Sequence, residues 1–331
     1  MRILHAAFST LVSGSSRYIC DLGARQIVSG HIVGAALPPR GGGVSIYDSL
    51  PAGMEVLSAL GSPGWIGLRQ AIRAFKPDIL HFHDGRGPRA IRWIPNHPPS
   101  VITLHLGYKK AMAPVDGLIR IAKWQDVSGY PGKVVTVRNW RTASPQVPRE
   151  KALAIRAQIG AGEGITLIGC AVRLHPVKNV DVLIDAFRAV PANAVLAILS
   201  DGPERAALDA QATGDARIKF VGMQSNVDEW FAAFDAFVQP SSSEHSPLTL
   251  LEAMDAGLPI AAAANDGSAE MLEGQPARLF PVGDRAALAE ILQEWAAAPP
   301  QRADYDLSAF DPARAAAAIE GFYREVIAAR Q

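Results

Sequence analysis

The sequence has little cysteine, no long apolar run and no excess charge of either sign. Its 331 residues include two cysteines, Cys20 and Cys170, each in an apolar stretch. We expect both to be small core residues of a protein in a reducing compartment, rather than partners in a disulfide. No stretch reaches the roughly 18 apolar residues of a membrane-spanning helix, and the opening run MRILHAAFST soon meets Ser and Gly, as a first buried strand would. These absences predict a cytoplasmic protein without a signal peptide, attached at most to the inner face of a membrane.

The composition is that of a folded protein with ample core. Apolar residues make up 49% of the chain and charged residues 19%. Such a balance argues against disorder. The length is too great for most single cores and suits two domains of ordinary size.

The formal net charge of zero hides an asymmetry along the chain. Residues 1–160 contain 20 Lys and Arg against 8 Asp and Glu, whereas residues 161–331 contain 12 against 24. The basic half could attract an anionic acceptor or contact an anionic membrane surface, or the two halves could merely attract each other. No known nucleic-acid-binding motif accompanies the basic charge, so no nucleic-acid partner is expected.

Short β-rich apolar runs alternate with helical patterns along the whole chain, which predicts βαβ units and parallel sheets. Candidate strands cover 3–8, 32–36, 79–82, 101–105 and 134–137, then 165–171, 194–199, 218–221, 236–239, 260–263 and 277–280. Candidate helices cover 17–28, 65–75 and 88–94, then 180–189, 204–212, 227–234, 247–256, 269–273, 285–297 and 312–329. The stretch 38–63 is expected to be irregular and 139–149 to be a linker. The pattern predicts an α/β protein of two Rossmann-like domains, 1–150 and 151–308, whose ligands bind beyond the carboxyl ends of the strands.

The strongest motif is the run Pro240-Ser-Ser-Ser-Glu-His-Ser-Pro-Leu-Thr-Leu-Leu-Glu-Ala-Met-Asp-Ala-Gly-Leu-Pro259. A buried strand ends just before it, and a helix is expected to begin near Pro247. Free backbone N–H groups at a helix start can hold a pyrophosphate. Glu244 enters before that helix and Glu252 lies within it, so one carboxylate could reach sugar hydroxyls and the other ribose hydroxyls. Taken alone, the two glutamates fit a helix cap and a solvated side chain equally well.

This run resembles the donor-binding signature of family 4 retaining glycosyltransferases of GT-B fold, E-x7-E followed by A-M-x-x-G-x-P. Four further segments agree with the family in order and spacing: Cys170–Phe187, Leu199–Pro203, Phe220–Gly222 and Asp266–Glu270. The resemblance covers nearly all of the second half. It implies two domains with a cleft between them, and a C-terminal helix at about 309–331 that returns to the first domain.

The resemblance also implies roles for individual residues. Glu252 would hold the ribose, Arg173 and Lys178 the diphosphate, and Glu244 the sugar together with His105. The nucleotide would be surrounded by Gly202, Pro203, Val221, Ser246, Pro247 and Leu248, with Gly14 and Ser15 from the first domain. His245 and Ser246 stand where the family commonly has small or aromatic residues, and this departure leaves the donor sugar open.

The expected role of Arg173 and Lys178 can also be argued from chemistry, without the family resemblance. Breaking a nucleotide–sugar bond leaves negative charge on a diphosphate, which a metal ion or fixed cations must stabilise. The sequence offers one Asp-x-Asp pair, Asp304-Tyr-Asp306, in a polar stretch that we interpret as solvated surface. Arg173 and Lys178 are therefore the expected substitutes, and no metal cofactor is expected. Two surface cations would be the alternative interpretation.

The first half of the sequence contains weaker matches to the family. The segment Ser13-Gly-Ser-Ser-Arg17 resembles the family's N-terminal glycine loop, although a helix cap explains the serines as well. His81, His83 and His105 end strands, and so are expected at the ligand edge of the sheet. A metal site built from these three is a lesser alternative, because strand-end histidines are often hydrogen-bonded structural residues.

We therefore expect a retaining, metal-independent glycosyltransferase of the hexosyltransferase type. Its donor would be a nucleoside diphosphate sugar and its acceptor a sugar or lipid-linked hydroxyl, in cell-surface polysaccharide or glycolipid synthesis. A sugar-nucleotide epimerase of GT-B fold would act on the donor without an acceptor. A non-catalytic sugar-nucleotide-binding protein would keep the donor residues but transfer nothing. A serine hydrolase based on Ser243 and His245 is rejected, because the chain lacks a G-x-S-x-G elbow there.

Overall fold

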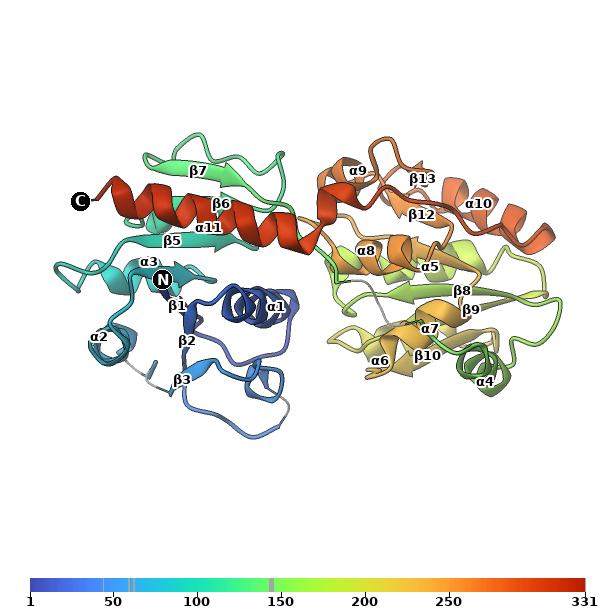
Figure 1. Ribbon diagram of the computed structural model, residues 1–331. Coiled ribbons are helices and arrows are strands. Elements are labelled where there is room, and N and C mark those ends of the chain that lie inside the picture. The colour runs from blue at the N-terminus through green and yellow to red at the C-terminus, as the bar shows by residue number, and fades with distance from the viewer. Residues whose placement is uncertain (44, 59, 62, 143–145, 331) are drawn as a thin grey trace. The chain divides into compact units, whose positions relative to one another are not determined.

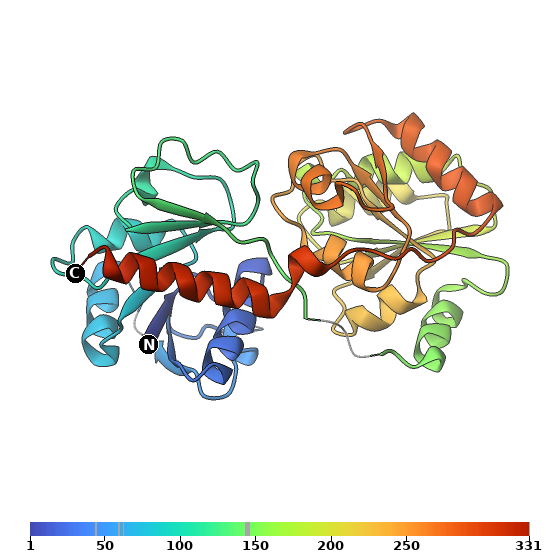
Figure 2. The ribbon, with the colours of Figure 1, turned by 45° about the horizontal axis from the view of Figure 1, so that its top comes forward.

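A computed structural model describes residues 1–43, 45–58, 60–61, 63–142 and 146–330. The chain divides into two compact units, Met1–Asn139 with Phe310–Gln331, and Trp140–Ala309 (Figures 1 and 2). Each unit is built on its own parallel sheet. Within the described ranges, no helix combines the length and the hydropathy needed to cross a membrane.

The first unit is built on a seven-stranded parallel sheet in the order β3-β2-β1-β4-β5-β6-β7. Its strands are β1 Arg2–Ala6, β2 Ile32–Leu37, β3 Glu55–Ser58, β4 Ile79–Phe82, β5 Ser100–Leu104, β6 Gly117–Arg120 and β7 Lys133–Thr136. The central strands are buried, which is why they occur in the sequence as nearly continuous apolar runs. The strand order reverses between β1 and β4, the switch point at which ligands bind in sheets of this kind.

Helices cover both faces of this sheet. They are α1 Gly14–Val28, α2 Gly64–Phe75, α3 Arg86–Ile91 and α11 Pro312–Ala328, with short 3-10 turns η1 Ile46–Asp48 and η2 Lys110–Met112. A capping box between Ser13 and Ser16 begins α1. The C-terminal helix α11 lies along the first sheet, where it contacts α1 and β5 (Figure 1). Its buried residues, among them Ile319 and Tyr323, form the stripe that packs there.

The second unit is built on a six-stranded parallel sheet in the order β10-β9-β8-β11-β12-β13. Its strands are β8 Thr166–Ala171, β9 Ala194–Leu199, β10 Ile218–Gly222, β11 Ala236–Gln239, β12 Ile260–Ala263 and β13 Arg278–Phe280. Its helices are α4 Arg149–Ile159, α5 Val180–Phe187, α6 Arg205–Ala212, α7 Val227–Ala233, α8 Leu248–Asp255, α9 Asp266–Leu272 and α10 Arg285–Ala297, with η3 Pro176–Lys178 and η4 Ser308–Phe310 nearby along the chain. The strand order reverses between β8 and β11.

Every strand expected from the sequence is present, but two strands and one α-helix were not expected. The stretch 38–63 contains β3, and β6 lies between two expected strands. The helix α4 occupies the chain just after the expected linker and packs on α7. The helix α4 belongs to the second unit, which begins at Trp140, whereas the expected division of the chain was at 150. Residues 143–145 of the expected linker lie outside the described ranges.

Two smaller expectations can be compared with the structure. Cys20 and Cys170 are both buried free thiols, as predicted. Burial raises the pKa of the Cys170 thiol to about 12, so this residue is an inert part of the core. The Asp304-Tyr-Asp306 segment has both carboxylates exposed, while the Tyr305 hydroxyl donates to the carbonyl of Leu258.

Candidate functional site

In the second unit, three polar side chains meet at the carboxyl edge of the sheet, beside the switch point. Lys178 Nζ lies 2.6 Å from Glu244 Oε1, and Gln239 Nε2 donates to the same oxygen at 2.6 Å. Gln239 ends β11 and is fully buried, whereas Lys178 and Glu244 keep a small exposed fraction. Two donors therefore hold one carboxylate oxygen and leave the other oxygen of Glu244 for a further contact.

The backbone around Glu244 is fixed by close packing against α9. A Cβ atom on Gly267 would lie 2.3 Å from the carbonyl oxygen of Glu244, so only glycine fits there. Asn265, the N-cap of α9, donates from Nδ2 to the carbonyl of Ser241 at 2.8 Å. The backbone N–H of Ser242 donates to the carbonyl of Val177 at 2.8 Å, which ties this loop to the segment of Lys178. The Lys178–Glu244 pair is thus preorganised by its surroundings.

The loops after β8 and β9 lie against each other beside this pair. The N–H of Leu174 donates to the carbonyl of Asp201, and the N–H of Glu204 donates to the carbonyl of Leu174. A Cβ atom on Gly202 would lie 2.2 Å from the carbonyl oxygen of Leu174, so this approach requires glycine. Arg173 is exposed in the first of these loops. It supplies a second cation in the loop after β8, the strand that pairs with the one leading to Glu244.

The residues expected to surround the nucleotide lie on several elements of the second unit. Ser246 and Pro247 precede α8, which begins at Leu248 rather than at the proline, and Pro247 is its N-cap. The Ser246 hydroxyl contacts Met271 Sδ at 3.6 Å. Val221 lies in β10, and Pro203 follows Gly202 in the loop after β9. These residues therefore flank the same edge of one sheet, with α8 beginning beside it.

The glutamate expected at the ribose already has a partner. Glu252 is buried in α8, and its Oε1 lies 3.4 Å from Nη1 of Arg141. Arg141 also donates to Asp255 at 2.9 Å and to Asp228 at 2.7 Å. Burial acts to lower the pKa of Arg141, but the three carboxylates outweigh it and raise the pKa above its usual range. Sequence analysis did not assign Arg141 to the site, because the three carboxylates that surround it come from helices more than 80 positions further along the chain.

In the first unit, the glycine loop forms the start of α1. Ser13 is the N-cap, and its N–H donates to Ser16 Oγ at 2.7 Å. The Ser15 hydroxyl lies 2.9 Å from Ser13 Oγ, and Gly14 is the exposed first residue of the helix. The serines thus make the cap interactions that were the alternative interpretation of this segment.

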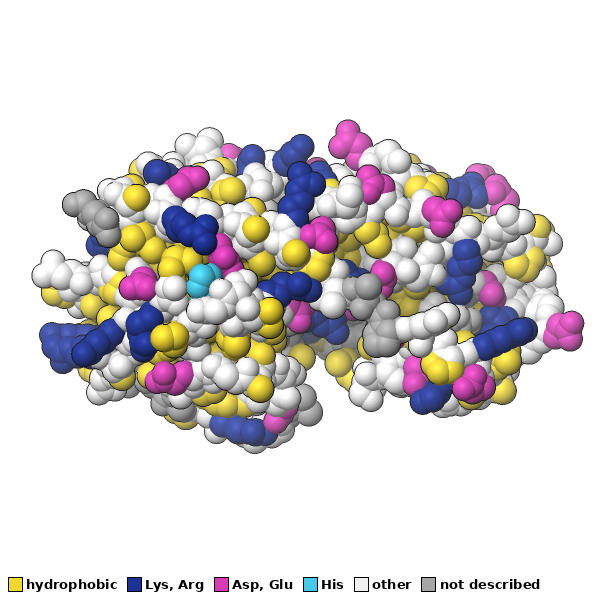
Figure 3. All heavy atoms as spheres, viewed as in Figure 1, with side chains coloured by type: hydrophobic (Ala, Val, Ile, Leu, Met, Phe, Trp, Pro, Cys, Tyr) yellow, Lys and Arg dark blue, Asp and Glu magenta, His cyan; other side chains and the backbone are white. Residues whose placement is uncertain are grey.

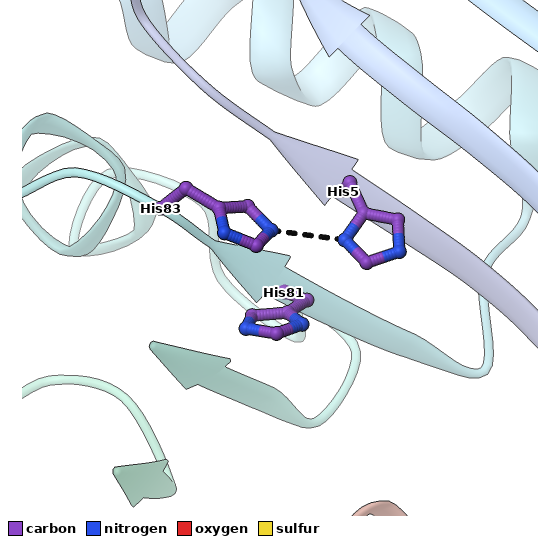
Figure 4. Close-up of side chains that lie close together, drawn as sticks. All are labelled: His5, His81 and His83. Atoms are coloured by element: carbon purple, nitrogen blue, oxygen red, sulfur yellow. Dashed lines mark hydrogen bonds between the residues drawn. The ribbon is translucent and has the colours of Figure 1, made fainter. Parts of the chain in front are cut away.

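The histidines expected at the ligand edge join a fourth that was not expected. His5 of β1 is in register with His81 of β4 across the sheet. His83 follows β4, and its Nε2 lies 2.9 Å from His5 Nδ1 (Figure 4). His105 follows β5, and its Nε2 lies 3.3 Å from His83 Nδ1. Burial lowers the pKa of His5 and of His105 to about 4 and lowers the pKa of His81 and His83 well below its usual value, so all four rings are neutral at pH 7.

Three of these histidines could geometrically hold a metal ion, but hydrogen bonds occupy them. The ligand atoms of His5, His81 and His83 lie within 4.8 Å of one another. Both ring nitrogens of each have a partner, namely His83 and Gln26 for His5, Tyr323 and Thr103 for His81, and His5 and His105 for His83. A metal would have to displace several of these bonds. The candidate set also differs from the expected one, since His105 is replaced by His5.

Comparisons with known proteins agree with this description. Residues 165–297 match the family model of glycosyl transferases group 1. The lipopolysaccharide core biosynthesis mannosyltransferase LpsB of Rhizobium meliloti is 32% identical over 140 residues, which are 39% of this chain and 40% of that protein. The glycosyltransferase LpsD of the same organism is 28% identical over 248 residues, 68% of this chain and 67% of that protein. The sulfoquinovosyl transferase SQD2 of Arabidopsis thaliana is 31% identical over 41% of this chain, and the match spans 28% of that protein.

Solved structures show the fold. The crystal structure of Anabaena HepE in complex with UDP and glucose has a TM-score of 0.80 at 19% identity, covering 98% of this chain and all of that one. WaaG, a glycosyltransferase involved in lipopolysaccharide biosynthesis, has a TM-score of 0.69 at 16% identity and covers 96% of this chain and all of that one.

The fold is therefore GT-B, with two Rossmann-like domains. The second unit contains a domain of the glycosyl transferases group 1 type, and the resemblance to family 4 glycosyltransferases is confirmed. The segment matched by the family model includes Arg173, Lys178, Glu244 and Glu252.

Proposed function

We propose that the protein is a retaining glycosyltransferase that moves a hexose from a nucleoside diphosphate sugar to an acceptor hydroxyl. The observation that carries the proposal is the preorganised Lys178–Glu244 pair, with an exposed Arg173 in the same loop as Lys178, at the switch point of a glycosyl transferases group 1 domain. Crystal structures of HepE are complexes with UDP and glucose, with UDP, and with UDP-glucose, which supports a nucleotide sugar as donor here.

The charges suit a departing diphosphate. When the bond between the sugar C1 and the diphosphate breaks, negative charge develops on the phosphate oxygens. Arg173 can hold such oxygens bidentately, and Lys178 adds a compact charge. In this proposal the two cations supply the stabilisation that a metal ion supplies in other transferases, so transfer proceeds in the presence of a chelator.

The other residues hold the sugar and the nucleoside. Glu252 accepts hydrogen bonds from the ribose, and binding there requires that its contact with Arg141 be shared or given up. The second oxygen of Glu244 accepts from a sugar hydroxyl. The start of α8 at Ser246, Pro247 and Leu248 lies by the phosphates, while Gly202, Pro203 and Val221 lie by the base. Gly14 and Ser15 at the start of α1 are a further phosphate contact.

Retention follows from attack on the same face of the sugar from which the phosphate leaves. The bond from C1 to the diphosphate oxygen breaks, and a bond from C1 to the acceptor oxygen forms. The acceptor proton passes to the departing diphosphate oxygen, so the step is balanced without a dedicated protein base.

A thermal-shift panel tests the donor site. The purified protein is heated with each nucleoside diphosphate and its sugars in the presence of EDTA, and the same panel is run on Glu252→Ala and Arg173→Ala. We expect a shift for one base that both variants lose. A shift that requires a divalent metal would overturn metal independence, and no shift for any member with folded protein would overturn the donor site.

Two alternatives share the donor site and are distinguished by products. An epimerase would convert the donor into a second nucleotide sugar without an acceptor, and a non-catalytic binding protein would return the donor unchanged. Analysis of the donor after incubation with acceptor mixtures separates these outcomes. The lipopolysaccharide-core relatives LpsB and LpsD favour transfer to an acceptor of cell-surface polysaccharide or glycolipid type.

The first unit has features that suit a lipid-linked acceptor and a peripheral membrane site on the cytoplasmic side. It contains 19 Lys and Arg against 10 Asp and Glu, and basic side chains gather over α2 on the face in Figure 3. Leu11 and Val12 follow β1 and Leu106 follows β5, and they are 73%, 56% and 66% exposed at the carboxyl edge of the sheet. We expect the protein to float with anionic vesicles and not with neutral ones. The substitution Leu106→Ser should weaken its binding to the anionic vesicles. Equal flotation with anionic and neutral vesicles would contradict an electrostatic contribution to membrane binding.

A further inference from the structure

A row of hydrogen bonds runs through the first unit from a buried glutamine to a partly exposed histidine. Gln26 Oε1 lies 2.8 Å from His5 Nε2, and His5 Nδ1 lies 2.9 Å from His83 Nε2. His83 Nδ1 lies 3.3 Å from His105 Nε2. The row crosses three elements, α1, β1 and the loop after β4, and ends after β5, the strand next to the switch point between β1 and β4.

Each bond in the row has a direction. A neutral imidazole carries one N–H donor and one nitrogen lone pair. The amide oxygen of Gln26 can only accept, so His5 Nε2 carries hydrogen and His5 Nδ1 carries the lone pair. His83 must then donate from Nε2 and accept at Nδ1, which requires His105 to donate from Nε2. The direction therefore passes unchanged along three rings and leaves the lone pair of His105 at Nδ1.

A second row begins at the amide nitrogen of Gln26. Gln26 Nε2 donates to the hydroxyl oxygen of Tyr323 at 3.4 Å, and that hydroxyl in turn bonds to His81 Nδ1. His81 Nε2 lies 2.7 Å from Thr103 Oγ1, and Thr103 donates to the hydroxyl of Tyr18 at 3.3 Å. Gln26 is the shared residue of the two rows, a donor to one and an acceptor for the other.

Burial keeps the row intact. Gln26, His5 and His83 are buried, and water cannot reach them to offer other partners. Burial also holds the pKa of His105 at about 4, so no ring in the row carries a second proton at neutral pH. His105 is only half-buried, and within the described ranges no side chain or backbone group is hydrogen-bonded to its Nδ1. The lone pair at this atom is therefore available to a ligand.

We propose that Gln26, acting through His5 and His83, fixes His105 as the Nε2–H tautomer, so that its Nδ1 accepts a hydrogen bond from a substrate hydroxyl. Phosphate and carboxylate oxygens are acceptors and are excluded at this atom, because a neutral lone pair repels them. His105 thus discriminates a hydroxyl-bearing group from an anionic one. The identity of that group as the donor sugar rests on the proposed function, whereas the tautomer does not. Gln26 and His5 are positioning residues, since they act on the substrate only through His105.

Nitrogen-15 NMR of the full-length protein tests the tautomer directly. The chain has 8 histidines, and labelling them alone gives a spectrum in which His105→Gln identifies the His105 signals. Long-range proton–nitrogen correlation at pH 7 distinguishes a protonated from an unprotonated ring nitrogen. We expect His105 to show one tautomer, with the proton on Nε2. A proton on Nδ1, or a mixture of tautomers, in the unmodified protein would overturn the proposal without any variant.

Three variants test the role of Gln26. Gln26→Met removes the acceptor and should give His105 a mixture of tautomers, whereas Gln26→Glu keeps an acceptor and should retain the single one. Ser100→Ala is the matched control, because Ser100 is buried on β5, the strand that leads to His105, and its hydroxyl bonds to Asp116 rather than to either row. It should leave the His105 signals as they are. A single Nε2–H tautomer in Gln26→Met would show that Gln26 does not act on His105.

A titration separates this inference from the proposed function. Addition of the nucleoside diphosphate sugar selected by the thermal-shift panel should move the His105 Nδ1 resonance, whereas the nucleoside diphosphate alone should not. If no nucleotide binds, the proposed function fails while the tautomer measurement stands. If the nucleotide sugar binds and the Nδ1 resonance does not move, the hydroxyl contact of His105 is wrong and the donor site remains.

Discussion

Lys178 Nζ lies 2.6 Å from Glu244 Oε1, although 66 positions separate the two residues in the sequence. The pair joins the turn after β8 to the loop after β11, the two strands on either side of the switch point. Gln239 holds the same carboxylate oxygen. In the proposed enzyme the pair keeps a cation beside the diphosphate and a carboxylate beside the sugar, each oriented by the other.

The first prediction concerns this pair. Lys178→Met removes a charge aimed at the leaving group and should lower kcat by about 100-fold. Glu244→Gln should lower kcat as well, and the double variant should be less impaired than the product of the two effects, because directly bonded residues are not independent. Steady-state transfer rates measure all three. Lys151→Met is the control, since Lys151 makes an exposed ion pair with Glu229 of similar length, 2.9 Å. Full activity in Lys178→Met would refute the assigned role.

The second prediction concerns nucleotide affinity. Glu252→Gln keeps the shape of a buried side chain but removes the charge that a ribose diol would contact. A hydrogen bond to a charged group contributes about 1.5–3 kcal/mol, so we expect Kd for the nucleoside diphosphate to rise by about 10- to 100-fold. Isothermal titration calorimetry measures it. Glu294→Gln, an exposed glutamate on α10, should bind as the unmodified protein does. An unchanged Kd in Glu252→Gln would remove Glu252 from the site.

The third prediction concerns stability against pH. The pKa of His5 and of His105 lies near 4 in the folded protein, against 6.5 for an unperturbed histidine. Between these values the unfolded chain binds protons that the folded chain does not, so the free energy of unfolding falls as pH falls. Each such histidine contributes up to about 1.4 kcal/mol per pH unit in that window and nothing above it. Urea unfolding at a series of pH values measures the slope.

A variant pair isolates the histidine contribution to that slope. His83→Phe removes one buried titrating ring, and the slope between pH 6.5 and pH 4 should become shallower. His175→Gln, at an exposed position, should keep the slope of the unmodified protein. If His83→Phe has the same slope as the unmodified protein, His83 binds as many protons in the folded state as in the unfolded state between pH 4 and pH 6.5, which would contradict its neutral, buried state.

The fourth prediction concerns the loops beside the site. Gly202→Ala places a methyl group 2.2 Å from the carbonyl oxygen of Leu174. The backbone must move to accept it, which should lower the free energy of unfolding by about 1–3 kcal/mol and weaken nucleotide binding. Gly162→Ala is the matched control, because its Cβ would meet nothing within 4 Å. Chemical unfolding compares the two, and equal stability would show that the contact of Gly202 with Leu174 is not tight.

The sequence predicted the parallel sheets because their buried strands are short apolar runs bounded by turns. It missed β3 because Gly, Pro and Ser dominate the stretch around it, and it missed α4 because few of that helix's residues are buried. The segments carrying Arg173, Lys178, Glu244 and Glu252 were identified from their resemblance, in order and spacing, to family 4 glycosyltransferases. The bond between Lys178 and Glu244 was not, since it depends on how two loops pack.

The histidine row could likewise be predicted from the sequence only in part. His83 and His105 directly follow β4 and β5, and His81 lies near the end of β4, so their place toward one edge could be inferred. His5 could not be included, because only the register of β1 with β4 brings it beside His81. Gln26 is an unremarkable polar residue on α1, and nothing in its neighbours along the chain indicates that its side chain is buried against His5.

The most direct test of the account is the stereochemistry of the sugar that the protein releases. The donor selected by the panel is incubated with EDTA, and early proton NMR spectra record the anomer of the transferred sugar or of the sugar slowly released to water. We predict release of the nucleoside diphosphate together with a sugar of the same anomeric configuration as the donor, and loss of both signals in Lys178→Met. A product of inverted configuration, or a donor that stays intact with every acceptor fraction tried, would contradict retaining sugar transfer.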